Sequence, residues 1–173
     1  MKLDQDMRAV IQAAHLCFAA TVTPDHRPNL SPKGTIRVWD DDHLFFLDIA
    51  SPKTRGNLEH NPWIELNVVE QTSRRGYRFF GMASLHRGDE VYGEATSRVF
   101  AEEGATYPVE AVVLISVERA DPLVSPGYWT VTDEVAMRTL WRQRRAALDQ
   151  EFEAFLAKRP PFRVKRQREE KSS

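Results

Sequence analysis

The alternation of hydrophobic and polar positions predicts strands through most of the first 120 residues. Runs of strand-forming side chains are interrupted by turn signals, such as Pro24-Asp25 and the three consecutive aspartates at 40–42. Several connections have the length of a hairpin, which favours antiparallel pairing. The run 111–117 is nearly all apolar, which is typical of a strand buried on both faces. The expected strands cover residues 16–23, 29–38, 43–49, 63–69, 76–86 and 111–117.

Four other segments show the helical period. The first repeats apolar side chains every three or four residues as far as Ala14, and Asp4 or Asp6 can cap its start. The second is short, with Ser51 as its N-cap and a proline in its first turn, and it ends near residue 60. The third covers about residues 89–103, and the fourth runs from residue 132 to the two prolines at 160–161.

Six strands with helices between and after them indicate an α+β protein built on an antiparallel barrel, not a doubly wound sheet. We expect a barrel domain over residues 1–130, a helical extension over 131–160 and a charged, disordered tail over 161–173. The extension carries an apolar stripe that includes Trp141 and Phe152. This stripe is expected to dock on the barrel or on a partner subunit.

Composition excludes several classes of protein. The chain has 173 residues, a net charge of −1 and a single cysteine, so it can build neither a disulfide framework nor a cysteine-based zinc site. Cys17 lies in an apolar stretch and is expected to be an inert core thiol, and the scattered histidines predict no metal site. Neither a Gly-x-Gly-x-x-Gly sequence nor a P-loop occurs. No apolar run approaches the length of a membrane span, and the start of the chain lacks a signal sequence, which predicts a cytoplasmic protein.

Charge is distributed unevenly along the chain. Residues 138–173 carry 11 basic and 5 acidic side chains, whereas the part before them is acidic. In that segment the acidic residues are interleaved with the basic ones, and no base-stacking platform lies near them. The pattern therefore favours a solvated helix face over a nucleic-acid interface.

The segment Ser-Pro-Lys-Thr-Arg-Gly-Asn-Leu at 51–58 carries the clearest chemical signal. The first turn of a helix usually holds acidic side chains, but this one holds Lys53 and Arg55. Free backbone N–H groups, the hydroxyls of Ser51 and Thr54 and the Lys53 ammonium are together the parts of a phosphate site. The alternative is an exposed, solvated turn, because one misplaced lysine costs little.

The strand expected over residues 29–38, one hairpin before this helix, suggests a place for a flat ligand. Gly34 and its small polar neighbours would allow a ring to lie against the backbone, since glycine has no Cβ. A strand with a bulge at Pro32 is the alternative. Together the two segments predict a planar ring over one strand and its phosphate at the start of the next helix.

These segments also carry a resemblance to a known family. The sequences PNLSPKGTIRVWDDDHLFFLDIASPKTRGNLEHNPWIELNVV and GYRFFGMASLH resemble the pyridoxamine 5'-phosphate oxidase-like, FMN-binding split-barrel family over about residues 5–125. The resemblance implies a six-stranded split barrel and a homodimer with two FMN molecules at the subunit interface. It also implies positions for the parts of the flavin. The ring would lie near Ser31, Pro32, Lys33, Gly34 and Thr35, and Ile49, Ala50 and Ser51 would follow the ring and its ribityl chain. The phosphate would be held by Ser51, Lys53, Thr54 and Asn57, and Arg78 would lie near the flavin.

The function implied by this resemblance is an FMN-dependent oxidoreductase that transfers a hydride or electrons to an unknown substrate, with a reduced nicotinamide as the expected donor. No side chain stands out as an acid or base, and Lys33 could stabilise charge on the reduced flavin. True pyridoxamine-phosphate oxidases end in an arginine- and histidine-bearing segment, whereas this chain continues with Ser-Pro-Gly-Tyr-Trp and a basic helix. Vitamin B6 synthesis is therefore not expected. A non-catalytic FMN carrier or storage protein, or a barrel that binds the deazaflavin F420 or haem, remains an alternative.

Overall fold

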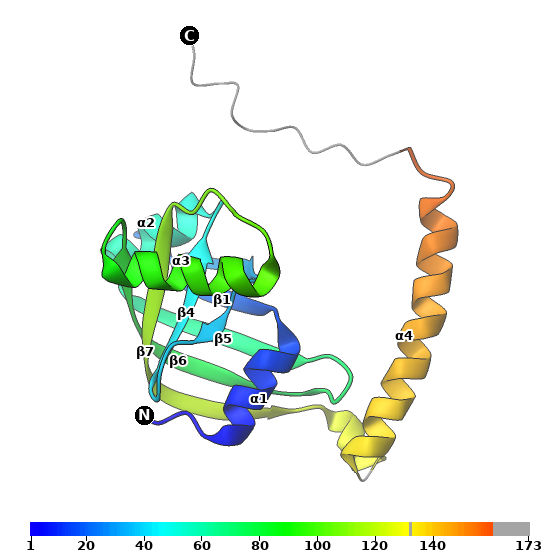
Figure 1. Ribbon diagram of the computed structural model, residues 1–173. Helices are drawn as coiled ribbons and strands as arrows, with labels where there is room; N and C mark the ends of the chain where they lie inside the picture. Colours follow the sequence, from blue (N-terminus) through cyan, green and yellow to red (C-terminus); the bar gives the residue numbers. More distant parts are fainter. Residues whose placement is uncertain (132, 161–173) are drawn as a thin grey trace.

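One antiparallel sheet of seven strands organises the molecule, and it curls into a split barrel (Figure 1). The computed structural model describes residues 1–131 and 133–160. The sheet has the strand order β2-β1-β5-β6-β7-β4-β3, with β2 and β3 at its two edges. The strands are β1 (Cys17–Val22), β2 (Pro28–Lys33), β3 (Arg37–Val38), β4 (His43–Asp48), β5 (Trp63–Glu70), β6 (Arg75–His86) and β7 (Ala111–Val124).

Four α-helices accompany this sheet in the described part of the chain, which confirms the α+β prediction. They are α1 (Gln5–Ala14), α2 (Pro52–His60), α3 (Glu90–Glu103) and α4 (Glu134–Leu156). Three of them begin with an aspartate whose carboxylate accepts a backbone N–H in the first turn: Asp4 before α1, Asp89 before α3 and Asp133 before α4. These caps explain why the expected and observed helix starts agree within two residues.

The core has two parts, one on each face of β4. Leu44 and Phe46 pack with α1 and the inner residues of the barrel, whereas Phe45 and Leu47 pack with Ala95 and other residues of α3. A strand covered on both faces needs apolar side chains at every position, and this one is buried from Leu44 to Asp48. The expectation of two-sided burial for residues 111–117 holds for the start of β7, where Ala111, Val112 and Val113 are all buried.

The single strand expected over residues 29–38 is wrong, because the chain changes partner in its middle. β2 pairs with β1, whereas β3 pairs with β4 at the opposite edge of the sheet. Residues 34–36 therefore join the two edges of the curled sheet. This raises the count from six expected strands to seven. β7 also continues to Val124, beyond the expected end at 117, because Arg75 at the start of β6 pairs with it there.

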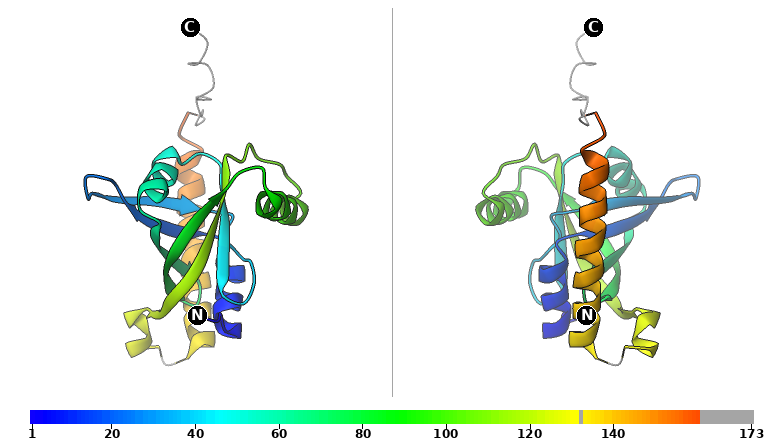
Figure 2. Two further views of the ribbon diagram at one scale, coloured as in Figure 1. Left: turned by 90° about the vertical axis from the view of Figure 1, so that its left-hand side faces the viewer. Right: turned by 90° about the vertical axis from the view of Figure 1, so that its right-hand side faces the viewer.

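The long helix α4 leaves the barrel after its first turns (Figure 1), and the right-hand view of Figure 2 shows it in front of the barrel with no other described element over it. Met137 is fully buried, and the Arg74 guanidinium lies 4.2 Å from the centre of the Trp141 ring. Beyond them Leu148, Phe152 and Phe155 are each more than half exposed. The outer part of the stripe is thus not covered by the described barrel. The disordered tail expected over 161–173 lies outside the described residues. None of the described helices is long and apolar enough to cross a membrane.

Glu70 holds the loop between β5 and β6 and ties it to α4. Its carboxylate accepts N–H groups from Thr72 at 2.9 Å and Ser73 at 2.7 Å, and it pairs with Arg138 of α4 at 2.7 Å. Burial alone would raise the pKa of Glu70, but the hydrogen bonds from Thr72 and Ser73 outweigh it and lower the pKa to about 2.

We expect Glu70→Gln to lower the free energy of unfolding at pH 7 by about 2 kcal/mol, the scale for hydrogen bonds to a charged group. The pKa of Glu70 in the folded protein lies below its ordinary value of 4.5, so this contribution is complete above pH 4.5 and is lost as the pH falls toward 2. Urea unfolding of wild type and Glu70→Gln between pH 7 and pH 2.5 measures the difference in free energy of unfolding, which should shrink as the pH falls. Glu59→Gln, at an exposed pair with Arg87, is the control and should change stability little. A pH-independent difference would contradict this account.

Candidate functional site

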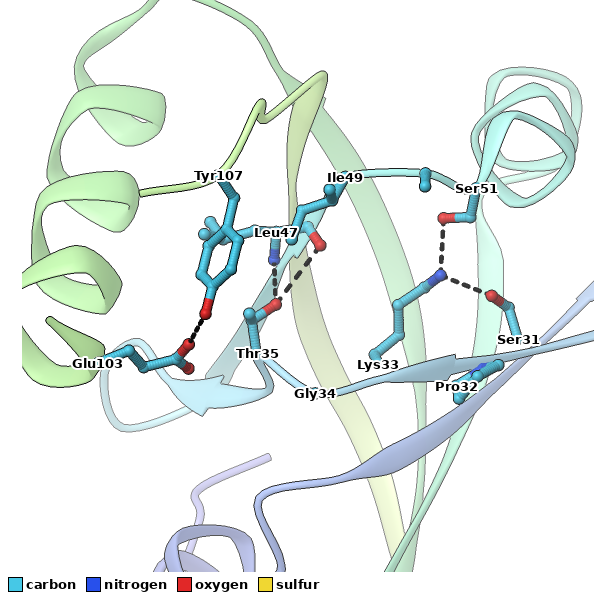
Figure 3. A pocket seen from close by; sticks show the side chains of 11 residues that line it. Ser31, Pro32, Lys33, Gly34, Thr35, Leu47, Ile49, Ser51, Glu103 and Tyr107 are labelled. Carbon is cyan, nitrogen blue, oxygen red and sulfur yellow. Dashed lines mark hydrogen bonds between the residues drawn. The ribbon is translucent and has the colours of Figure 1, made fainter. Parts of the chain in front are cut away.

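A cavity of about 500 Å³ opens where β2 turns toward β3 and where β4 leads into α2 (Figure 3). This volume is within the range of small-molecule sites. Eight of the twelve residues expected to hold FMN line it together with three others. The lining residues are Ser31, Pro32, Lys33, Gly34, Thr35, Leu47, Ile49, Ala50, Ser51, Glu103 and Tyr107.

Lys33 supplies the cationic group of this cavity. The residue is only 6% exposed, and its Nζ donates to the hydroxyls of Ser31 and Ser51, each at 2.7 Å. Burial lowers the pKa of Lys33, while the nearby Asp48 carboxylate acts in the opposite direction. The sheet thus retains a buried ammonium between two hydroxyls.

Asp48 is the counter-charge that sequence reasoning missed. It is 1% exposed and accepts from Arg55 Nη1 at 2.5 Å, from the Ser51 backbone N–H at 3.1 Å and from the Ser51 hydroxyl. The two cations in the first turn of α2 therefore differ, because Arg55 is neutralised by Asp48 and Lys53 is exposed. The sequence did carry one signal for this role, because Asp48 is an acidic residue at the end of the otherwise largely apolar strand β4.

The residues expected to bind the phosphate fall into two sets. Ser51 occupies the N-cap position, but its hydroxyl bonds to Lys33 and Asp48 and does not cap the helix. Thr54 and Asn57 are buried on the barrel side of α2. Asn57 Nδ2 donates to Thr21 at 2.9 Å, and Asn29 Nδ2 donates to Thr54 at 3.3 Å. These two residues attach α2 to β1 and β2, and they lie outside the described cavity lining, as Lys53 does.

Gly34 leaves space at the mouth of the cavity. A Cβ added there would meet no described atom within 4 Å, so packing of the described chain does not require glycine. The adjacent Thr35 is fixed, because the Leu47 N–H donates to its Oγ1 at 2.9 Å. The backbone between β2 and β3 is thus held to β4 while one face of it stays open.

Arg78 is not brought into this cavity. It lies on the outer face of β6, where its Nε contacts Glu65 at 3.1 Å and Asn67 at 3.4 Å on the neighbouring strand β5. Within one chain this residue therefore lies on a different surface from the eight that line the cavity.

Glu103 and Tyr107 line the cavity opposite Lys33 and were not anticipated from the sequence (Figure 3). Tyr107 Oη donates to Glu103 Oε2 at 2.6 Å, and Arg37 Nη2 donates to Glu103 Oε1 at 2.9 Å. These residues come from the end of α3, the following loop and β3. Glu103 and Tyr107 are only four residues apart, but the curl of the sheet is what brings them to Arg37 and to the cavity beside Lys33.

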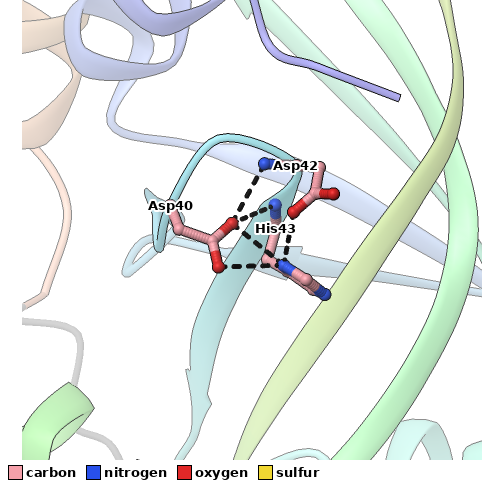
Figure 4. Close-up of side chains that lie close together, drawn as sticks. All are labelled: Asp40, Asp42 and His43. Carbon is pink, nitrogen blue, oxygen red and sulfur yellow. Dashed lines mark hydrogen bonds and ion pairs between the residues drawn. The ribbon is translucent and has the colours of Figure 1, made fainter.

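Two further clusters have structural explanations. Cys17 is fully buried, and burial raises the pKa of its thiol to about 12, as expected for an inert core cysteine. Asp40, Asp42 and His43 lie close enough to share an ion (Figure 4). However, Asp40 Oδ1 accepts the backbone N–H groups of Asp42 and His43, so these side chains already form a hydrogen-bonded turn.

Comparison with known proteins identifies the family. The sequence model described as pyridoxamine 5'-phosphate oxidase matches residues 3–123. The chain belongs to this family. No curated protein matches the chain. Among solved structures of the fold, HupZ of Group A Streptococcus shares 32% identity and a TM-score of 0.64, covering 71% of this chain and 95% of its own.

Two more distant structures share the split-barrel fold of the family. An FMN-binding protein of Syntrophomonas wolfei has 16% identity and a TM-score of 0.58, over 69% of this chain and 84% of its own. HutZ, the haem storage protein of Vibrio cholerae, has 20% identity and a TM-score of 0.56, over 72% of this chain and 95% of its own. The fold is thus common to proteins whose names indicate different ligands.

Proposed function

We propose that the protein is an FMN-dependent oxidoreductase whose flavin lies in the cavity beside Lys33. The observation that carries this proposal is the buried ammonium of Lys33, held between two hydroxyls beside open space at Gly34. A buried cation is retained at a cost in stability, which is explained if an anionic or electron-rich ligand uses it.

The residues fit a flavin nucleotide in chemistry as well as in volume. Backbone and small side chains of Ser31–Thr35 would border the ring, and the segment Ile49–Ser51 would follow the ribityl chain toward α2. Lys53, Thr54 and Asn57 at that helix are the proposed phosphate ligands, of which Lys53 has the exposed charge. When bound, the flavin supplies hydride or electron transfer, and the chain's own residues bind it, orient it and stabilise its charge.

The lining of the cavity favours a flavin over haem. Haem iron is usually held by histidine, cysteine, methionine or tyrosine. Among the described residues the cavity presents no histidine, cysteine or methionine, and the hydroxyl of its tyrosine is bonded to Glu103. The deazaflavin F420 has a similar three-ring system with carbon in place of N5, and its absorption spectrum distinguishes it from FMN.

We expect the purified protein to bind one FMN per chain and to show the two absorption bands of an oxidised flavin, not the single band of a deazaflavin or the Soret band of haem. Addition of a reduced nicotinamide should bleach them. Lys53→Ala should weaken FMN binding by about tenfold or more, while leaving riboflavin binding unchanged, since riboflavin lacks the phosphate.

Fluorescence titration with both flavins measures this difference. Equal FMN affinity in Lys53→Ala would remove Lys53 from the phosphate site. A colourless protein that ignores added FMN would contradict the proposed function. A one-to-one complex without steady-state turnover on any electron donor would instead support a carrier.

We also propose a homodimer formed through the outer face of β2, β1, β5 and β6. Phe18, Leu30, Trp63 and Met82 on these strands are each at least 39% exposed. Such a concentration of large apolar side chains is typical of a subunit interface. Leu30 lies two residues before Pro32, which lines the cavity, so a partner on this face would adjoin the flavin.

Leu30→Glu is expected to convert the dimer into a monomer without lowering the free energy of unfolding of the separate chain by more than about 0.5 kcal/mol, because this side chain is two-thirds exposed. Light scattering after size exclusion measures the mass. Val135→Glu, at an exposed apolar residue of α4, is the matched control and should remain dimeric. A monomeric wild-type protein would contradict the proposal.

A further inference from the structure

Tyr107, Glu103 and Arg37 form a directed chain of hydrogen bonds on one side of the cavity (Figure 3 shows the first two). Arg37, whose side chain is largely buried, donates from Nε to Glu102 at 2.7 Å and from Nη2 to Glu103 at 2.9 Å. Glu103 in turn accepts the Tyr107 hydroxyl at 2.6 Å. The orientation of every group in the chain follows from the fixed donors of the guanidinium.

This arrangement makes Tyr107 an acceptor toward the cavity. The phenol has one proton, and the carboxylate of Glu103 already takes it, so only oxygen lone pairs remain for a ligand. The hydrogen bond to Glu103, together with burial, raises the pKa of Tyr107, which keeps the phenol protonated and neutral. A ligand at this side of the cavity must therefore present an N–H or O–H donor.

The opposite side of the cavity has the reverse character. There Lys33 and the hydroxyls of Ser31 and Ser51 present a cation, next to the start of α2. A flat ring that carries an N–H at one edge and electron-rich or negatively charged atoms at another would match both sides. An apolar edge placed against Tyr107 and Glu103 would instead desolvate their acceptors without compensation.

We propose that Tyr107 selects and orients the flavin by accepting the imide N3–H of its ring, with Glu103 and Arg37 as positioning residues. The inference rests on the proposed function, because it requires the flavin in this cavity. It adds a residue outside the segments 31–35 and 49–57 to the cofactor site. It also explains why an acidic side chain lies in a cavity that takes an anionic nucleotide, since Arg37 neutralises it and Tyr107 separates it from the ligand.

Binding of FMN and of N3-methyl-FMN, which lacks this N–H, tests the inference. Wild-type protein is expected to bind FMN about fivefold more tightly than the methylated analogue, the scale of one neutral hydrogen bond. Tyr107→Phe should bind FMN about fivefold more weakly than wild type and should lose the preference. Glu103→Gln, which frees the phenol proton to turn toward the cavity, should also reduce the preference.

Tyr92→Phe is the matched control. Its hydroxyl donates to the Val109 carbonyl at 3.0 Å and so supports the same loop, but it does not line the cavity. This variant should retain the preference for FMN. Loss of the preference in Tyr92→Phe as well would mean that the loop as a whole is responsible and would overturn the role of Tyr107.

Two other results would overturn the inference while leaving the proposed function intact. The first is equal binding of FMN and N3-methyl-FMN to wild-type protein. If Tyr107→Phe then raised the KM for reduced nicotinamide, the Tyr107 hydroxyl would be assigned to binding that second substrate. The second is an undiminished preference in Tyr107→Phe. Failure of the wild type to bind FMN at all would instead refute the proposed function.

Discussion

Asp48→Asn is expected to lower the free energy of unfolding by about 3 kcal/mol, the largest effect we predict for a single side chain. The carboxylate is 1% exposed and pairs with Arg55, whose own side chain is largely buried. Asparagine would leave that guanidinium without a counter-charge, and its amide group would face a donor. Removal of one partner from a buried ion pair costs more than the pair contributes, because the remaining charge stays desolvated.

Urea unfolding at pH 7 measures this loss. Asp41→Asn is the control, since Asp41 pairs with Lys2 and Arg8 but is 72% exposed, and we expect it to cost less than about 1 kcal/mol. Adding Arg55→Met to Asp48→Asn should recover part of the stability, because the unpaired cation is then removed. Equal losses in Asp48→Asn and Asp41→Asn would show that burial of the pair is unimportant.

Lys33→Met is expected to weaken FMN binding by about tenfold or more and at the same time to stabilise the protein. The affinity loss follows from the charged hydrogen-bond donor that the cavity would lose. The gain in stability, about 1 kcal/mol, follows from replacing a buried cation by an apolar side chain of similar length. A residue that lowers stability and is nevertheless placed in a cavity is best explained by ligand binding.

The stabilisation should depend on pH in a defined direction. Burial lowers the pKa of Lys33 below its ordinary value of 10.5, so the unfolded chain holds this proton more tightly than the folded protein. The penalty is complete below the lowered pKa and disappears as the pH rises toward 10.5. The difference in free energy of unfolding between Lys33→Met and wild type should therefore shrink from neutral to alkaline pH.

Urea unfolding at pH 7 and pH 9.5 and FMN titration of each variant measure both effects. Lys53→Met is the control, because Lys53 is exposed and its replacement should change stability by less than about 0.5 kcal/mol at either pH. A destabilised Lys33→Met protein with unchanged FMN affinity would assign Lys33 to packing and remove it from the site.

The helices of this protein could be predicted because their signals are local. Asp4, Asp89 and Asp133 each accept a backbone N–H three residues later, so the start of a helix is encoded within one turn of chain. The end of α4 at Leu156 likewise precedes the two prolines that cannot continue it. The exact strand partners had no such signal, since period and propensity do not identify a neighbour.

In the candidate site, too, some features have local signals in the sequence and others depend on the tertiary structure. Gly34 and the start of α2 stood out by residue type and spacing, Lys33 was implied by the family resemblance, and the structure brings the segments 31–35 and 49–51 to one cavity. Whether they hold FMN remains a prediction. The role of Asp48 was hidden because an acidic residue at a strand end has many ordinary uses, and its pairing with Arg55 depends on how β4 enters α2.

By itself the amino-acid sequence determined the α+β class, the starts of the helices, the burial of the first part of β7 and the cationic side chains at the start of α2, because each is signalled by residues within a few positions of one another. Tertiary structure alone decided that residues 28–38 divide between the two edges of the sheet, and that Glu103 and Tyr107 lie across the cavity from Lys33. These outcomes depend on the curl of the sheet, which is set by packing between segments distant in the chain and is not encoded by any one of them.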